Sequence, residues 1–353
     1  MARIDPFLDD VIAKRASDLH IAPGRPPFAR LRGELANITD GVLSAKDVDE
    51  IIDELLSPQQ RARLGIEQSL CFAHAYAHKD GPARFRGQIV KIQNGTRATF
   101  RAVPRRAPAL ADIACPEVVW RLADRRSGLV IVAGPAGSGK TTTLAAMIDH
   151  VNKTRACHVV TIEDPIEVVH EPARSQITQR EIGVHASSVA GALKNAVREN
   201  ADVVLVSSLR SREAIQAAVA LASSGVAVFA AMPANNVGAA VERLLLGLDD
   251  RSMLGDALAG VVAQQLVGDI AVHEVLVSSP AVATVLRDGK VRELSSIMKT
   301  GETQGMLTFD ICFERLMQAG KIAPERALEL SFDKEAFAKV VGKVRPDLVS
   351  EAE

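Results

Sequence analysis

The spacing of hydrophobic and polar positions changes along this chain near residue 105. Before that point, the segments Phe28 to Leu35 and Phe85 to Ile92 alternate apolar and polar residues, which is typical of strands buried on one face. A helix-like stretch, Ile4 to Ala16, precedes them. The pattern therefore predicts a small N-terminal α+β domain over residues 1–104.

Beyond a stretch with two prolines and a basic pair, continuous apolar runs alternate with helical patterns. The four strand candidates are residues 128–133, 158–163, 202–207 and 226–231. Strands buried on both faces read as unbroken apolar runs, so these runs favour a largely parallel sheet. We expect a linker over 105–120 and an α/β domain over 121–270. The pattern is mostly helical from about residue 234, which predicts a helical C-terminal region over 271–353.

The most specific motif is a glycine-rich turn that follows the first of these strands. Residues 134–141 read GPAGSGKT, which fits the phosphate-binding pattern G-x-x-x-x-G-K-[ST]. The apolar run before it and the helix-forming run after it argue against a chance match, because a helix that starts at such a turn surrounds a phosphate with backbone N–H groups. Lys140 is expected to reach the β- and γ-phosphates, and the Thr141 hydroxyl to ligate Mg²⁺. The candidate nucleotide-binding residues are Gly134, Pro135, Ala136, Gly137, Ser138, Gly139, Lys140, Thr141 and Thr142.

Composition and charge narrow the class of protein. Hydrophobic residues make up 47% and charged residues 24% of the 353 positions, as in an ordinary globular protein. The formal net charge of -1 gives no electrostatic case for binding nucleic acid or a membrane surface. No apolar run approaches the ~20 residues of a transmembrane segment, and the N-terminus has no signal-peptide core, so we expect a cytoplasmic protein. The cysteines have no C-x-x-C spacing, which indicates buried free thiols rather than a zinc site or disulfides: Cys71, Cys115, Cys157 and Cys312.

Several blocks, in order, resemble one family of secretion ATPases, the type IV pilus retraction ATPases (PilT-like). The blocks are SDLHI at 17–21, GRPP at 24–27, RLRG at 30–33 (which includes Arg32), RFR at 84–86, FRAVP at 100–104, the phosphate loop, TIEDPIE at 161–167 and GMLTFD at 305–310. TIEDPIE corresponds to the acidic motif called the Asp box in that family. The resemblance extends over roughly residues 4–335, and its specificity lies in separate motifs that recur in the right order.

The resemblance implies a RecA-like P-loop NTPase domain, preceded by a small PAS-like α+β domain and followed by a helical C-terminal tail. It implies a ring ATPase that binds ATP with Mg²⁺, with Thr141 and Glu163 as metal ligands and Glu163 as a tentative catalytic acid. In the family, the acids at the positions of Glu163 and Asp164 lie beside the nucleotide. The alternative is that these two acids only end a strand and cap the turn before Pro165.

The resemblance also implies partners. Arg84, Arg86 and Arg101 match arginines that in the family face the nucleotide of a neighbouring subunit, whereas the alternative is that they are solvated charges on a strand face. The expected assembly is a homohexamer, or a mixed ring with an active paralogue. A pilus platform protein of the inner membrane is an open further partner, through which the chain would be peripheral to that membrane.

The departures from the family pattern concern hydrolysis. Where the family has the glutamate of G-E-M-R-D, this chain has Ser208, and where it has the histidine of T-L-H-T, this chain has Pro233. A serine hydroxyl is too weak a base at neutral pH to activate water, and proline lacks even a backbone N–H. The remaining departures are Val226 in place of a histidine, Asn94 in place of an arginine, Gln264-Gln265-Leu266 in place of Q-R-L, and a short deletion before Ile270.

Three functions stay open. The first is an ATP-binding component of type IV pilus (twitching motility) machinery with weak or absent hydrolysis. The second is a genuine but weak retraction motor that uses Glu163 as its acid. The third is a nucleotide-independent assembly scaffold, against which the intact Lys140 and Asp box argue.

Overall fold

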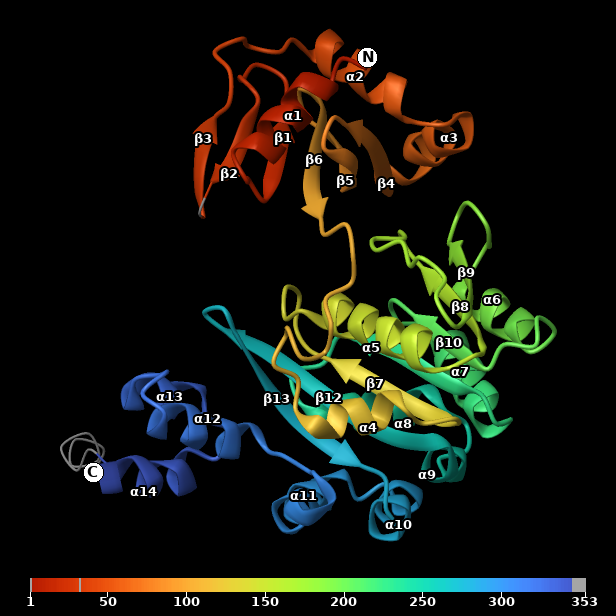
Figure 1. Cartoon of the computed structure of the whole chain (residues 1–353), viewed down its shortest axis with the longest axis vertical. Coiled ribbons are helices and arrows are strands. Elements are labelled where there is room, and N and C mark those ends of the chain that lie inside the picture. The colour runs from red at the N-terminus through yellow and green to blue at the C-terminus, as the bar shows by residue number, and fades with distance from the viewer. Residues whose placement is uncertain (1, 32, 345–353) are drawn as a thin grey trace. The chain divides into compact units, whose positions relative to one another are not determined.

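The computed structural model describes residues 2–31 and 33–344, and these divide into two compact units (Figure 1). The first unit contains the residues up to Ala107 together with Glu163–His170. The second contains Pro108–Ile162 and the described residues from Glu171 onward. Arg32, part of the N-terminal motif quoted above, lies outside the described residues.

The N-terminal unit is built on a six-stranded antiparallel sheet with the strand order β3-β2-β1-β6-β5-β4. Its elements are α1 (Asp5–Ala13), β1 (Asp18–Ile21), β2 (Phe28–Leu31), β3 (Glu34–Asn37), α2 (Ala45–Leu55), α3 (Pro58–Glu67), β4 (Ser69–His78), β5 (Gly81–Ile92) and β6 (Gly95–Val103). The segment predicted as one strand, Phe28 to Leu35, is a hairpin of β2 and β3. β2 ends at Leu31 and β3 begins at its partner Glu34, and the two-residue alternation alone does not reveal this pairing.

One face of this sheet is buried and the other is polar. The aromatic side chains of Phe72, Phe85 and Phe100 lie in the core, where the rings of Phe72 and Phe100 meet edge to face at 6.1 Å. Because side chains alternate along a strand, Arg86 and Arg101 are directed away from that core. The predicted α+β domain thus places its arginines on the face of the sheet opposite the core.

The second unit contains a seven-stranded sheet with the strand order β13-β12-β7-β11-β10-β8-β9. Its strands are β7 (Gly128–Ala133), β8 (His158–Glu163), β9 (Gln176–Glu181), β10 (Val203–Val206), β11 (Ala227–Met232), β12 (Leu258–Val267) and β13 (Ile270–Val277). The pairs from β12 through β7, β11 and β10 to β8 are all parallel, whereas β13 runs antiparallel to β12. The predicted parallel sheet is therefore confirmed.

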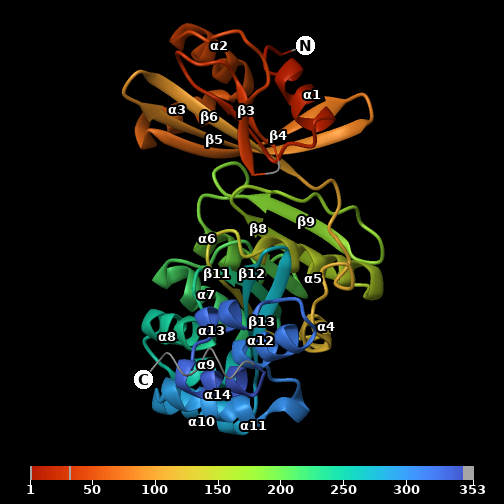
Figure 2. The same cartoon turned by 90° about the vertical axis from the view of Figure 1, so that its left-hand side faces the viewer.

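Helices and short 3-10 turns surround this sheet. They are α4 (Glu117–Ala123), α5 (Lys140–Thr154), α6 (Val189–Ala196), α7 (Arg212–Ser223), α8 (Val237–Gly247), α9 (Ser252–Ala257), α10 (Pro280–Asp288), η1 (Val291–Glu293), α11 (Leu294–Thr300), η2 (Glu302–Gln304), α12 (Phe309–Gln318), α13 (Pro324–Leu330) and α14 (Lys334–Val344). Helix α12 packs beside β13, as Figure 2 shows, and Val275 of that strand bridges to Leu307 just before the helix.

The region after residue 234 is less helical than its pattern predicts, because β12 and β13 form a hairpin there. Most of β12 is buried, and its sequence is accordingly a short, mainly apolar run. Such a run fits a buried helix segment as well as a buried strand, and periodicity does not separate the two. The hairpin extends the parallel sheet beyond β7, which places β12 directly beside the strand that leads into the phosphate loop.

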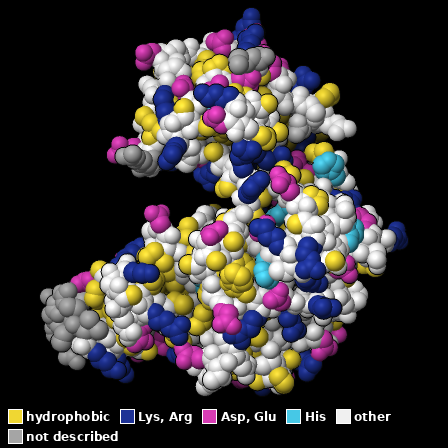
Figure 3. Space-filling view, viewed as in Figure 1, with side chains coloured by type: hydrophobic (Ala, Val, Ile, Leu, Met, Phe, Trp, Pro, Cys, Tyr) yellow, Lys and Arg dark blue, Asp and Glu magenta, His cyan; other side chains and the backbone are white. Residues whose placement is uncertain are grey.

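The core of the second unit lies on both faces of its sheet. Leu129 and Ile131 of β7 pack with α7 and α8, whereas Val130 and Val132 pack with α4 and α5. The unit is therefore a three-layer sandwich in which α5 lies along one face (Figure 1). On the face of the molecule seen in Figure 3, basic and acidic side chains are interspersed, in line with the formal net charge of -1.

The four cysteines are free and half-buried. The sequence predicted buried free thiols: the thiols are free, but their burial is only partial. Cys115, Cys157 and Cys312 pack against the core of the second unit. Cys157, for example, immediately precedes β8 and packs against the core there.

Candidate nucleotide-binding site

The glycine-rich loop lies between the end of β7 and the start of α5, as the motif predicts. The N–H of Gly134 donates to the carbonyl oxygen of Met232 at 3.2 Å, which ties the loop to the end of β11. Gly139 precedes α5 with φ at 88°, a left-handed conformation that favours glycine. The structure describes no side-chain cap on this helix, whereas Ser211 caps α7 and Asn236 caps α8. Backbone N–H groups that no side chain caps are suited to bind a phosphate.

Lys140 is held at the mouth of the loop. Its Nζ donates to the carbonyl oxygen of Pro135 at 2.6 Å and to Oγ of Ser138 at 3.5 Å. Burial lowers the pKa of Lys140, and the nearby positive charge of Arg210 lowers it further. Two cations therefore lie close to each other at this loop, and a polyanionic ligand would relieve their repulsion.

The chain segment after β10 lies beside the ends of β8 and β11. The N–H of Ser207 donates to Ile162 at 2.9 Å, and the N–H of Leu209 donates to Ala231 at 2.8 Å, so the segment runs on between β8 and β11. Within it, the Ser208 hydroxyl accepts a hydrogen bond from Nε of Arg210 at 2.8 Å. The side chain expected at the position of the family's glutamate is thus a hydroxyl that is already paired with a cation.

The other departure, Pro233, immediately follows β11. Its carbonyl oxygen accepts a hydrogen bond from Nη1 of Arg243 at 3.2 Å. The next helix, α8, begins after Asn236, whose side chain accepts from the N–H of Ala239 at 2.8 Å. Pro233 itself therefore offers no side-chain donor or base and no backbone N–H.

Glu163 is the last residue of β8, and it is buried, with 6% of its surface exposed. It takes part in further polar interactions within the structure. The segment that it begins, Glu163–His170, groups with the N-terminal unit, whereas Thr141 belongs to the second unit.

The three candidate arginines, Arg84, Arg86 and Arg101, each have a partner within the N-terminal unit. Nε of Arg84 donates to the carbonyl oxygen of Ile166 at 2.9 Å. Arg86 contacts Sγ of Cys71 at 3.3 Å and the Glu167 carboxylate at 2.7 Å. Two of the three therefore hold the Asp-box segment.

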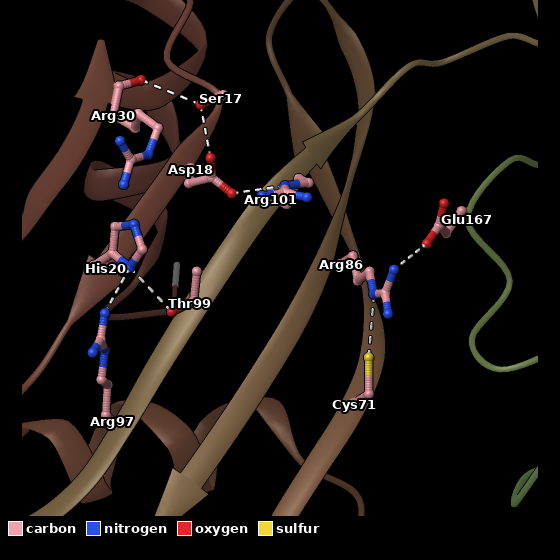
Figure 4. Close-up of polar contacts among 10 residues, drawn as sticks. All are labelled: Ser17, Asp18, His20, Arg30, Cys71, Arg86, Arg97, Thr99, Arg101 and Glu167. Carbon is pink, nitrogen blue, oxygen red and sulfur yellow. Dashed lines mark hydrogen bonds and ion pairs between the residues drawn. The ribbon is translucent and has the colours of Figure 1, made fainter. Parts of the chain in front are cut away.

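Arg101 has a different partner, the buried carboxylate of Asp18, at 2.8 Å. Burial opposes ionisation of Asp18, but hydrogen bonds from Ser17 and Arg101 outweigh it, so the pKa of Asp18 is lowered. The structure thus places Arg84 and Arg86 against the Asp-box segment, and it places Arg101 in a separate ion pair. Figure 4 shows Arg86 with Glu167 and Arg101 with Asp18.

Two further residues lie at the loop without having been assigned a role from the sequence. One is Arg210, and the other is Gln264 of β12, whose side chain contacts Ser138 and Thr143. Both occupy positions that match the family's motifs, G-E-M-R-D and Q-R-L. That match was the available signal, but it gave no information about which atoms these side chains contact.

Known proteins are similar to this chain in sequence and in fold. The family described as Type II/IV secretion system protein matches residues 1–281. The retraction ATPase PilT of Pseudomonas aeruginosa is 35% identical over 333 residues, which is 91% of this chain and 96% of that protein. The type IV pilus ATPase PilU of the same organism is 36% identical, over 90% of this chain and 86% of that protein.

Solved structures agree with the sequence matches. A crystal structure titled as the pilus retraction motor PilT with bound ADP has a TM-score of 0.85 at 30% identity, covering 95% of this chain and 99% of that one. Among the described residues, no helix combines the length and apolar character that crossing a bilayer requires. The family match covers most of the chain, and the relatives match nearly end to end. The chain therefore belongs to the type II/IV secretion system protein family, within which it is a PilT-like ATPase.

Proposed function

We propose that this chain is an ATP-binding ring component of type IV pilus machinery whose own ATP hydrolysis is weak or absent. The observation that carries the proposal is Ser208, which stands where the family has its glutamate and whose hydroxyl accepts a hydrogen bond from Arg210. A complete phosphate loop lies in the same unit. A site that retains its binding loop while the general base is replaced favours binding over turnover.

The proposed binding step rests on the phosphate loop. Backbone N–H groups at the start of α5 would donate to the phosphates, and Lys140 would exchange its bond to Pro135 for a phosphate oxygen. Arg210 adds a second positive charge nearby. The residues fit a triphosphate, and the proposed ligands of its Mg²⁺ are Thr141 and Glu163. The bound metal would neutralise charge on the phosphate oxygens.

Weak hydrolysis follows from the side chains at the two altered positions. A serine hydroxyl does not accept a proton from water at neutral pH, and the loss of a general base typically costs 10² to 10⁴ in rate. Pro233 presents only a carbonyl oxygen, which Arg243 already contacts. Neither position supplies a group that would take the proton from an attacking water.

A second candidate function is a genuine, slow motor that uses Glu163 as its acid. The burial of Glu163 favours this candidate, because a carboxylate with only 6% of its surface exposed is shielded from bulk water. The third candidate, a scaffold that does not use nucleotide, has no such support, since the loop retains its glycines and Lys140.

The proposed assembly is a homohexamer, or a mixed ring with an active paralogue, on the cytoplasmic side of the inner membrane. Arg84, Arg86 and Arg101 are the proposed contacts to a neighbour's nucleotide, which would require each of them to exchange the partner that it has within one chain. A pilus platform protein is the proposed route of peripheral membrane association.

Two measurements on the purified chain test the function: equilibrium binding of ATP with Mg²⁺, and phosphate release, each with and without an active paralogue. We expect binding, together with turnover far below the usual range of about 1 to 10³ s⁻¹. Brisk release that survives Ser208→Ala but collapses in Glu163→Gln would instead establish the slow-motor candidate. Absence of any nucleotide binding would leave the scaffold.

A further inference from the structure

Gln264 joins the phosphate loop to a strand far away in sequence. It lies in β12 with only 3% of its surface exposed. Its Nε2 donates to the carbonyl oxygen of Ser138 at 2.7 Å, and its Oε1 accepts from the hydroxyl of Thr143 at 2.7 Å. Ser138 belongs to the loop and Thr143 to the first turn of α5, so one side chain holds both parts of the phosphate-binding element.

Hydrogen-bond chemistry determines how this carboxamide is oriented. The carbonyl oxygen of Ser138 is only an acceptor, so it must face the amide nitrogen of Gln264. The amide oxygen then faces the Thr143 hydroxyl, which donates. Both bonds are buried, where an unpaired polar group is costly, so the arrangement is strongly preferred over any other rotation of the side chain.

At two positions of the loop, glycine has no Cβ atom and so makes room for Gln264. A Cβ on Gly139 would lie 2.6 Å from Nε2 of Gln264, and a Cβ on Gly134 would lie 2.4 Å from its backbone carbonyl oxygen. Either contact is too close for two non-bonded atoms. The glycines therefore serve the packing of β12 against the loop as well as its approach to a ligand.

The contact with Ser138 also determines the direction of a neighbouring donor. A peptide group is planar and trans, so its C=O and N–H point in opposite directions. Because Gln264 holds the Ser138 carbonyl toward β12, the N–H of Gly139 in the same peptide points away from β12. That N–H is one of the loop donors on which phosphate binding depends.

We propose that Gln264 is a positioning residue for nucleotide binding: by holding the Ser138 peptide and Thr143, it sets the direction of the loop donors and hence the affinity for the phosphates of a nucleotide. The inference rests on the proposed nucleotide binding. Gln264 itself touches no phosphate in this arrangement and acts through the loop backbone.

The test compares variants of nearly equal volume. Gln264→Met removes both hydrogen bonds, and Thr143→Val removes one while keeping the shape of the side chain. Thr143→Ser keeps the hydroxyl and serves as the conservative variant. Gln265→Met is the matched control, since it makes the same substitution at the next position of β12, where no contact with the loop is described.

The readout is the Kd for ADP, measured by calorimetry on the full chain well below its melting temperature, beside the melting temperature without nucleotide. We expect Gln264→Met and Thr143→Val to raise the Kd about ten-fold or more, and Thr143→Ser and Gln265→Met to leave it within about two-fold. The folded fraction at the assay temperature should be complete in every variant.

Two outcomes overturn the inference. The first is an unchanged Kd in both Gln264→Met and Thr143→Val. The second is a loss of binding that only follows the unfolded fraction, which would show that Gln264 supports the fold and nothing more. If the wild-type chain binds no ADP or ATP at all, the proposed function fails as well, so the two failures are distinguishable.

Discussion

At the scale of single residues, the chemistry of this site depends on a few side chains whose contacts the sequence does not reveal. Ser208 is the clearest case, because its hydroxyl is paired with the guanidinium of Arg210. A glutamate side chain at this position would lie beside the same guanidinium. Substitution of Ser208 by Glu therefore tests two things together: the effect of restoring a carboxylate base, and the effect of Arg210 on that base.

We predict that Ser208→Glu raises ATP turnover by less than about 100-fold, the lower end of what a general base contributes. An ion pair with Arg210 would stabilise the charged form of the new carboxylate and make it a weaker base. Adding Pro233→His should raise turnover by more than the product of the two single effects, since residues of one catalytic unit act non-additively. Phosphate-release assays on the three variants check this, and turnover in Ser208→Glu equal to that of an active paralogue would contradict it.

Lys140 carries the second prediction at this scale. Lys140→Ala should raise the Kd for ATP by about 10- to 100-fold, because a hydrogen bond to a charged group contributes about 1.5 to 3 kcal/mol. Lys153→Ala, on the same helix and in an exposed pair with Asp149, is the control and should bind as the wild type does. Equal affinities in calorimetry for Lys140→Ala and the wild type would mean that the loop does not bind phosphate.

At the scale of secondary-structure elements, β13 joins two helices through one half-buried carboxyl group, that of Glu274. Glu274 accepts from the N–H of Val237 at the start of α8 and interacts with the backbone of Phe309 at the start of α12. Burial raises the pKa of Glu274 to about 7, and the charge of Asp310 adds to this. Its neighbour His273 shows the opposite effect, since burial lowers its pKa to about 4.

These two groups have opposite effects on stability. A folded pKa of about 7 for Glu274, against its ordinary value of 4.5, means that its contribution to stability is largest below pH 4.5 and is lost as the pH rises through 7. For His273, whose ordinary pKa is 6.5, the contribution to stability is complete above pH 6.5 and is lost as the pH falls toward about 4. Between these limits the two effects largely offset each other.

We therefore predict that Glu274→Gln is more sensitive to acid than the wild type. As the pH rises from about 4.5 to 7, the wild type loses the contribution of Glu274, and the variant has none to lose. The unfolding free energy of the variant should therefore rise relative to that of the wild type by on the order of 2 kcal/mol over this range. Urea unfolding at several pH values measures this difference, in which the contributions of all other groups cancel. Parallel stability curves for the two proteins would contradict the prediction.

At the scale of the whole molecule, the arginines of the N-terminal unit are the proposed links to a neighbouring subunit, but they differ in what they do within one chain. Arg86 is half-exposed, so its pair with Glu167 contributes little to folding, about 0 to 1 kcal/mol. Arg101 compensates the buried carboxylate of Asp18, whose side chain is only 5% exposed. We therefore expect that replacing Arg86 leaves the monomer folded, whereas replacing Arg101 destabilises it.

We predict that Arg86→Ala weakens ATP-dependent association while the monomer stays folded, and that Arg101→Ala lowers the melting temperature because it leaves Asp18 buried with one partner fewer. Sedimentation velocity with and without ATP, together with thermal unfolding, separates the two effects. Arg121→Ala, in an exposed pair on α4, is the control. Equal oligomer populations for wild type and Arg86→Ala would remove the interfacial role.

Much of this protein could be predicted from its sequence, because the relevant signals are local. The runs 128–133 and 158–163 match β7 and β8 residue for residue, and those predicted at 202–207 and 226–231 overlap β10 and β11. An apolar run of that length between helical patterns has few alternatives to a buried parallel strand. The phosphate loop was predicted for the same reason, since its glycines, Lys140 and the helix after them are contiguous.

Only the tertiary structure decided which distant side chains meet. The partners of Gln264 lie 126 and 121 residues away along the chain, and Glu167, the partner of Arg86 on the Asp-box segment, lies 81 residues away. The strand character of β12 was equally hidden, because a short buried run reads alike in a helix and a strand until its pairing with β7 is known. Sequence patterns report the local period of the backbone and the residues of contiguous motifs. Contacts between strands and loops depend on how the whole chain packs, and no local pattern records that.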